Sequence, residues 1–240
     1  MPWENKSIYG WVRQELYNMP KPLDGENNFL YQSLIEFAKV STQAFDNIGD
    51  YLFSYKEKQL SAIFLPAFYN LGYGVMQEAP TRRKKRGETY THAWLDYWVQ
   101  KDDETVFLVE VKHSWQYFGG ILKKDAISKI NSSVDQLKHI RKQDVRNLSL
   151  ANETVKLSLL VLPIYRNVPL DSNLKEDEEF MTERNEIDDM LSYLSQEMPS
   201  SISWMGVWLL PKRMQYTFQS NEINGLRTFP GVIILSCIIT

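Results

Sequence analysis

Residues 94–113 read WLDYWVQKDDETVFLVEVKH. Aromatic and aliphatic residues dominate both ends of this stretch, as they do in buried β-strands. Between them, Lys101-Asp102-Asp103-Glu104 is a short polar run of the kind that closes a tight turn. The stretch therefore predicts two antiparallel strands, at about 89–99 and 105–113, joined as a hairpin.

Three charged residues interrupt the apolar strands of this hairpin: Asp96 in the first, Glu110 and Lys112 in the second. Acidic residues are depleted from strands, and a desolvated carboxylate is costly unless it is paired or bound to a metal. Because strand side chains alternate, Glu110 and Lys112 share one face while Val109 and Val111 take the other. Two carboxylates and a lysine converging from neighbouring strands predict a compact site for a divalent cation and an activated water.

Hydrophobic periodicity extends the prediction to the rest of the chain. Helices are expected at about 29–46, 50–71, 121–146 and 176–197, and further strands at about 74–79, 155–164, 203–210 and 230–239. An antiparallel hairpin that leads into a helical crossover implies an α/β fold, a mixed sheet with helices on both faces. We expect residues 1–28 to be an irregular lead and 29–240 to be one domain, with its core at about 50–165 and an elaboration at 166–240.

Composition places the chain among ordinary globular proteins, with 43% hydrophobic and 24% charged residues. The single cysteine, Cys237, excludes an internal disulfide framework and fits a reducing compartment. The N-terminus lacks the basic start and apolar core of a secretory signal, and the longest apolar stretch, 232–239, is too short to span a bilayer. These features predict a cytoplasmic protein that has no membrane partner.

The hairpin resembles the motif of the PD-(D/E)xK nuclease superfamily, which includes many restriction endonucleases and the archaeal Holliday-junction resolvases. Members share a core of helix, three-strand meander, helix and strand. Their Asp lies on the second strand and their (D/E)xK on the third, as Asp96 and Glu110-Val111-Lys112 would here. The resemblance covers about residues 50–165 and implies a restriction-endonuclease-like core. Leu95 stands where the eponymous Pro would be, a common departure in such families.

The resemblance implies a role for each motif residue. Asp96 and Glu110 would be ligands of Mg²⁺, for which Mn²⁺ can substitute, and the Val111 carbonyl could complete the shell. Lys112 would orient or deprotonate the attacking water and offset charge that builds on the phosphate. The alternative is that all three charged residues are solvated on the open face of an antiparallel sheet.

Three further residues are candidates for the same site. Several family members place an additional Glu on the first core helix, and Glu57 occupies the matching place as an outer-shell or second-metal ligand. Glu78, on the first strand, is an alternative third carboxylate. Gln136 lies on the helix after the third strand, which often supplies a polar residue to the site; otherwise it is a plain helix-surface glutamine.

Five consecutive cations, Arg82, Arg83, Lys84, Lys85 and Arg86, join the first and second strands of the meander. Such a run can neutralise phosphates and give salt-sensitive affinity without reading bases. The alternatives are a solvated loop or a localisation tract. Beside the motif, we expect this run to contact nucleic acid.

Charge is unevenly spread along the chain, whose net charge is −3. Residues 171–197 hold ten acidic and two basic side chains, a net −8, so the remainder carries +5. A mildly basic body is compatible with a nucleic-acid substrate, and the acidic segment is a candidate protein-docking surface.

Together these features predict a metal-dependent nuclease that hydrolyses phosphodiester bonds, a DNA endonuclease. Dimerisation would suit an enzyme that cuts both strands. The alternative is a non-catalytic nucleic-acid-binding or assembly subunit that retains a nuclease-like fold.

Overall fold

One sheet organises the chain in the computed structural model. The structure describes residues 2–17, 24–83, 91–140, 151–168, 179, 181–220 and 225–239. Within them the strand order is β1-β2-β8-β10-β7-β5-β4-β3, while β6 pairs with β7 and β9 with β10. The strands are β1 (Glu4–Asn5), β2 (Trp11–Leu16), β3 (Gly74–Arg83), β4 (Thr91–Gln100), β5 (Thr105–His113), β6 (Gln116–Tyr117), β7 (Glu153–Asn167), β8 (Trp204–Leu209), β9 (Phe218–Ser220) and β10 (Gly225–Ile239).

The pairing is antiparallel except where β7 runs parallel to β5 and to the two-residue β6. Parallel neighbours need a crossover connection, and a helix between β6 and β7 provides it. The expected mixed sheet is therefore confirmed.

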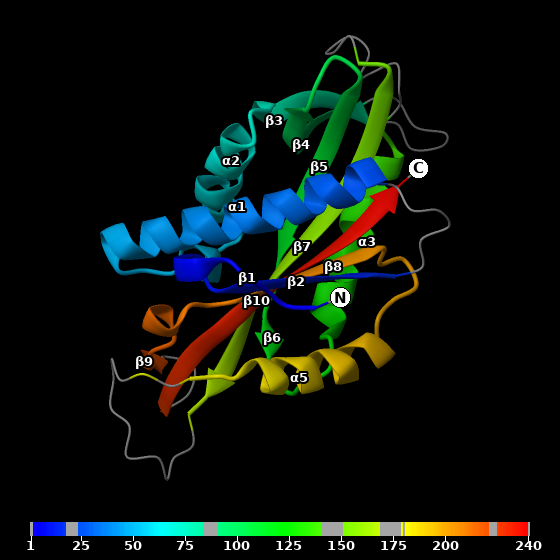
Figure 1. The fold of residues 1–240 in the computed structure, drawn as a ribbon. Helices are drawn as coiled ribbons and strands as arrows, with labels where there is room; N and C mark the ends of the chain where they lie inside the picture. The colour runs from blue at the N-terminus through cyan, green and yellow to red at the C-terminus, as the bar shows by residue number, and fades with distance from the viewer. Residues whose placement is uncertain are drawn as a thin grey trace.

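Helices cover both faces of the sheet, also as expected. The described α-helices are α1 (Asp24–Ile48), α2 (Ser61–Asn70), α3 (Lys124–Lys138) and α5 (Arg184–Gln196), and the 3₁₀ turns are η1 (Ser7–Tyr9), η2 (Leu52–Ser54), η3 (Glu57–Leu60) and η4 (Lys212–Met214). Figure 1 shows α1 lying across the front of the sheet, with α2 beside it and α3 behind the strands. Residues of α1 and α2 share one core cluster with the sheet, and residues of α3 and α5 share another.

The two central strands show why both faces must be covered. On β7, Leu159 and Val161 pack on the α1 side, while Leu160 and Leu162 pack on the α3 side. A strand buried on both faces reads as a continuous apolar run, which is how β7 and β10 read in the sequence. Among the described residues no helix is long and apolar enough to cross a membrane.

The element order of the expected core is present: α2, the meander β3–β4–β5, α3 and then β7. The helix expected at 50–71 begins only at Ser61, because η2 and η3 precede it. Gly72, with a positive φ of 79°, follows its last turn and lets the chain enter β3. The crossover helix expected at 121–146 ends at Lys138, and residues 141–150 lie outside the described part.

The prediction of an irregular lead at 1–28 is wrong. It contains β1 and β2, and α1 already begins at Asp24. β2 pairs with β8 over Trp11–Leu16, and Val12 is fully buried. The alternation of β2 was hidden because its other face carries Arg13 and Glu15, which read as solvated charges.

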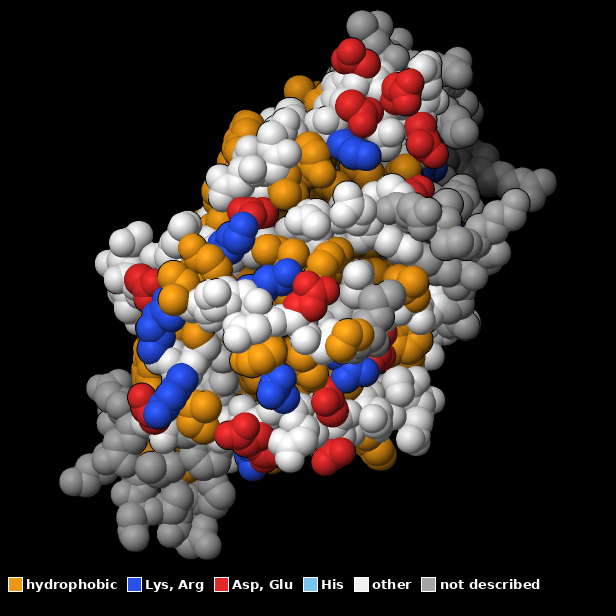
Figure 2. Space-filling view, viewed as in Figure 1, with side chains coloured by type: hydrophobic (Ala, Val, Ile, Leu, Met, Phe, Trp, Pro, Cys, Tyr) orange, Lys and Arg blue, Asp and Glu red, His pale blue; other side chains and the backbone are white. Residues whose placement is uncertain are grey.

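Surface charge is mixed on the face covered by α1. In Figure 2, the described acidic and basic side chains on this face are interspersed over most of the surface rather than separated into large patches. The excess of basic residues outside 171–197 therefore does not take the form of one extended basic surface on this face.

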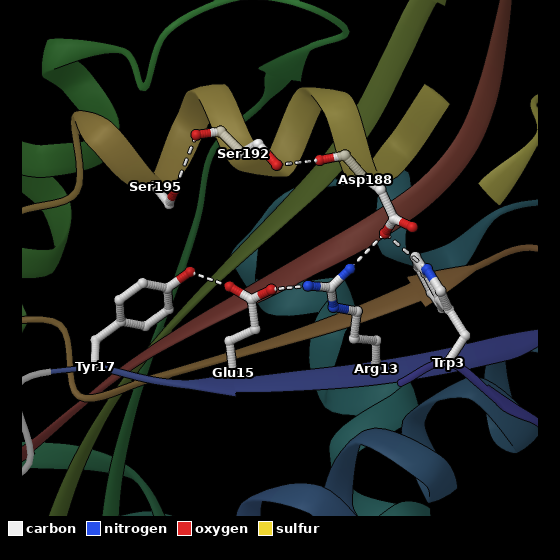
Figure 3. A network of polar contacts seen from close by, with 7 residues as sticks. All are labelled: Trp3, Arg13, Glu15, Tyr17, Asp188, Ser192 and Ser195. Atoms are coloured by element: carbon white, nitrogen blue, oxygen red, sulfur yellow. Dashed lines mark hydrogen bonds and ion pairs between the residues drawn. The ribbon is translucent and has the colours of Figure 1, made fainter. Parts of the chain in front are cut away.

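A polar network joins the charged face of β2 to α5 (Figure 3). Arg13 bonds both Glu15 on its own strand and Asp188 on α5. Asp188 also accepts a hydrogen bond of 2.8 Å from the Trp3 indole, and Tyr17 donates to Glu15. Burial, reinforced by that hydrogen bond, raises the pKa of Tyr17, so its hydroxyl remains a donor at neutral pH. The network thus anchors the N-terminal strand to α5.

We expect Arg13→Ala to lower the free energy of unfolding by about 1–3 kcal/mol, because it leaves the partly buried carboxylates of Glu15 and Asp188 without their shared cation. The Arg13 side chain is 20% exposed. The control is Lys212→Ala, whose ion pair with Glu179 is mostly exposed and should contribute less than about 1 kcal/mol. Urea denaturation measures both; equal effects would contradict an anchoring role for Arg13.

Candidate functional site

The site forms where β4 leaves β5. Their pairing runs from Gln100↔Val106 to Tyr97↔Val109 and goes no further toward the end of β5. On β4, Tyr97 packs in the core cluster on the α1 side, whereas Leu95 packs in a cluster beneath α3. The regular alternation of side chains along β4 is therefore broken between Leu95 and Tyr97, and Asp96 lies at the break.

The Asp96 side chain replaces a backbone hydrogen bond that β5 loses where β4 diverges from it. Its Oδ2 accepts a hydrogen bond of 2.7 Å from the Val111 N–H on β5. The N–H and C=O of one residue point to the same side of an extended strand, so the Val111 carbonyl faces the same gap. The gap thus presents a carboxylate and a backbone carbonyl at one place.

Glu78 marks the same position on β3. The register Gln77↔Tyr97 and Ala79↔Leu95 puts Glu78 opposite Asp96. Its φ is 48°, in the left-handed region that non-glycine residues rarely adopt. Such a conformation costs on the order of 1–3 kcal/mol and persists only where the surrounding structure holds it in place. Both strands are therefore distorted at Asp96.

Lys112 lies in the middle of a cluster of three carboxylates. Its Nζ lies 2.8 Å from Glu57 Oε1, 3.9 Å from Asp96 Oδ2 and 3.8 Å from Glu110 Oε2. Burial alone would lower the pKa of Lys112, but the hydrogen bond to Glu57 and the charges of Asp96, Glu57 and Glu110 outweigh it and raise that pKa. The ammonium is therefore charged at neutral pH. The Glu110 side chain is only 3% exposed, so this cation is an essential neighbour.

A cavity of about 130 Å³ opens beside these groups. Its lining consists of residues from η3, α2, β3, β4 and β5: Glu57, Lys58, Ser61, Gln77, Glu78, Asp96, Tyr97 and Val111. Counted with Glu110 and Lys112 beside it, four carboxylates face two ammonium groups, an excess of two negative charges when all are ionised. The sequence analysis missed Lys58, Ser61 and Gln77. The polar pair Gln77-Glu78 inside a strand was the signal that could have identified Gln77.

The donor set suits a divalent cation, although it is not a closed cage. Among the described residues, no three His, Cys, Asp or Glu side chains form a group that could hold a metal ion. Mg²⁺ does not require such a group, since it is usually bound by one or two carboxylates, several waters and substrate phosphate. Hard oxygens and surplus negative charge at the cavity fit that mode of binding.

The structure brings six predicted residues together: Glu57, Asp96, Glu110 and Lys112 lie in one charged cluster, and Val111 and Glu78 line the cavity beside it. Glu57 reaches the site from η3, a 3₁₀ turn, rather than from the helix that was expected to carry it. Glu110 lies on the side of β5 that faces α3 and does not line the cavity.

Gln136 is not brought to this group by any described contact. It lies near the end of α3, where Leu137 packs with Val106 and Leu108 at the start of β5. The opposite part of α3 meets the end of β5, where Lys129 Nζ donates to the His113 carbonyl at 3.0 Å. A residue one to two turns earlier on α3 would have been the better candidate.

The basic run is only partly described. Arg82 is an exposed residue of β3 and pairs in register with His92 on β4. Lys84, Lys85, Arg86 and the side chain of Arg83 lie outside the described part of the chain.

His113 ends β5 on the buried side. Its Nε2 lies 3.1 Å from the Phe53 carbonyl, and its ring packs edge-on against Trp115. Burial lowers the pKa of His113; the hydrogen bond to Phe53 opposes this effect and the charge of Lys129 adds to it. The residue therefore belongs to the structural support of β5.

Comparisons with protein-family models, curated proteins and solved structures returned no match. Functional conclusions therefore rest on the geometry of this site.

We expect Asp96→Ala to be less stable than Asp96→Asn by about 1–2 kcal/mol, because only asparagine keeps an acceptor for the Val111 N–H. Both substitutions remove the same charge, so the comparison isolates the hydrogen bond. Urea denaturation measures the difference. Equal stabilities would show that the Val111 N–H does not depend on this side chain.

A second prediction concerns pH. The folded state holds His113 at a lowered pKa, so the stability that it confers is complete above its unfolded pKa of about 6.5 and is lost as pH falls through the folded value. In EDTA, the unfolding free energy of the native protein should fall more steeply from about pH 7.5 to about pH 5 than that of His113→Gln, by at most about 1.4 kcal/mol per pH unit. His92→Gln is the exposed control. Identical slopes for native protein and His113→Gln would contradict this.

Proposed function

We propose that the protein is a metal-dependent nuclease that hydrolyses phosphodiester bonds, acting as an endonuclease on DNA. The observation that carries the proposal is the position of Lys112, within 4 Å of three carboxylates and beside a negatively charged cavity where β4 leaves β5. Structural stability alone does not require that combination of charges at a break in a sheet.

The element order supports the same proposal. The succession α2, β3–β4–β5, α3, β7, with β7 parallel to β5, matches what a restriction-endonuclease-like core would show. In that arrangement the second and third strands carry Asp96 and Glu110-Val111-Lys112. We therefore propose this finer fold class and kinship with the PD-(D/E)xK superfamily.

Asp96 and the Val111 carbonyl are the groups best placed to hold Mg²⁺, with Glu57, Glu78 and Glu110 as further donors. When bound, Mg²⁺ would supply positive charge that polarises the scissile phosphate and offsets charge on the leaving oxygen. Asp96 also holds the Val111 backbone in place, so one side chain both positions and charges the site.

Lys112 would act as a cation rather than as a base. Its raised pKa keeps three N–H donors at the site at neutral pH, which suits orienting the attacking water and stabilising the phosphate. Glu57 accepts one of those N–H groups at 2.8 Å and so directs the ammonium. Besides being a candidate donor to the cation, Glu57 thus positions Lys112 in this proposal.

Incubation with plasmid, linear duplex, single-stranded DNA and RNA in Mg²⁺, Mn²⁺ or EDTA tests the activity. We expect cleavage only with a divalent cation, and a loss of at least about 100-fold in Asp96→Asn and in Lys112→Met, because each removes charge stabilisation of the transition state. The matched controls are Asp103→Asn, in the exposed β4–β5 turn, and Lys138→Met, at the far end of α3; both should cleave like the native chain.

Cleavage that survives both site substitutions would refute the proposed mechanism. Binding of nucleic acid without cleavage of any substrate would instead favour the non-catalytic binding subunit.

A further inference from the structure

An exposed strip runs along the β3–β4 hairpin toward the candidate site. Its residues form two cross-strand pairs, Arg82↔His92 and Pro80↔Trp94, and all four are exposed. The alternate residues point the other way: Ala79 and Leu95 are buried in the cluster beneath α3. Strand alternation therefore puts the strip on the opposite side of the hairpin from α3.

The strip and the cavity open on the same side. The cavity is lined by Lys58 and Ser61, which belong to η3 and α2 on the side of the sheet away from α3. Two positions along from Pro80↔Trp94, past the pair Ala79↔Leu95, Glu78 lies opposite Asp96, and both of these line the cavity. Two residues along a strand span about 6.6 Å, so the backbone of Trp94 lies about one such step from the backbone of Asp96, the residue that would hold the metal.

Trp94 is the aromatic member of this strip. The residue is 64% exposed, more than any other large hydrophobic residue in the described chain. Tryptophan is highly buried on average, so an indole this exposed leaves an unusually large aromatic surface open to solvent. Along the hairpin, Trp94 lies between two charged positions. On one side is the Arg82 guanidinium, and on the other are the carboxylates of Glu78 and Asp96.

A strand of nucleic acid matches this order of groups. An aromatic ring offers a platform for a base, and adjacent cations neutralise the backbone. Bases within a duplex are stacked on one another and cannot lie on a protein ring unless they are first unstacked. An exposed indole beside the cavity therefore fits an unpaired base and not an intact duplex.

We propose that Trp94 stacks on an unpaired base of the substrate, so that single-stranded or locally unpaired DNA lies along Arg82, His92 and Trp94 with a phosphate directed to the cavity. This inference rests on the proposed function for the identity of the substrate and goes beyond it by naming the state of the strand that binds.

Intrinsic fluorescence and anisotropy test the contact in EDTA, where no cleavage is needed. The probes are fluorescein-labelled oligo(dT) and its duplex with oligo(dA) for anisotropy, and the same unlabelled molecules for tryptophan quenching. We expect oligo(dT) to bind more tightly than the duplex, and Trp94→Ala to weaken its binding by about 5- to 100-fold. Trp94→Phe should retain most of the affinity but lose the quenching. The control is Tyr193→Ala, which removes another exposed aromatic ring, on α5.

The outcomes separate this inference from the activity. If Trp94 is quenched by oligo(dT) but the native protein cleaves nothing, the nuclease proposal fails and the strip stands. If the native chain cleaves DNA while Trp94→Ala binds oligo(dT) as the native chain does, the strip fails and the nuclease proposal stands. Tighter binding of the duplex, or binding of neither probe, would also overturn the stacking role. Circular dichroism of each variant shows that the fold is retained.

Discussion

The hydrogen bond from the Val111 N–H to the Asp96 carboxylate is the constraint on which the candidate site depends. A strand that leaves its neighbour exposes backbone donors, and a donor buried without a partner costs on the order of 1–3 kcal/mol. Asp96 supplies the missing acceptor, so β4 can diverge while β5 remains ordered against β7. The divergence opens the cavity, and the side chain that permits it is also the first candidate ligand. Structure and chemistry therefore share one carboxylate.

The second constraint is electrostatic. Glu110 is almost fully buried, and Glu57, Glu78 and Asp96 add negative charge nearby. Lys112 offsets part of that charge, and the attraction of Glu57, Asp96 and Glu110 for its ammonium raises the pKa of Lys112. Repulsion among these carboxylates lowers the stability of the fold at the site, and packing in the two core clusters on either side of β7 must compensate for it. A bound divalent cation would relieve the same repulsion, which links occupancy of the site to stability.

Sequence periodicity predicted the meander and its flanking helix and strand because these elements have strong apolar patterns. Period-two alternation also correctly placed Glu110 and Lys112 on one side of β5. It failed for β2, whose charged face is tied to the rest of the fold through Asp188, a residue 175 positions away from Arg13. It failed for Gln136, since no local pattern states how far along a crossover helix each residue lies relative to the strand below it. The 3₁₀ turn that carries Glu57 was missed because helical spacing continues through it.

Segment charges were a poor guide to surface charge for the same reason. On α5, Asp188 and Glu186 pair with Arg13 and Arg166, so part of the acidity of 171–197 is used inside the fold. Near the candidate site, the strip and the cavity carry charges of opposite sign. Arg82 on the exposed strip is cationic, whereas the cavity beside Asp96 has surplus negative charge. A phosphate strand would be attracted to the strip and repelled from the cavity. Binding along the strip should therefore need no metal, and only entry of a phosphate into the cavity should require a divalent cation.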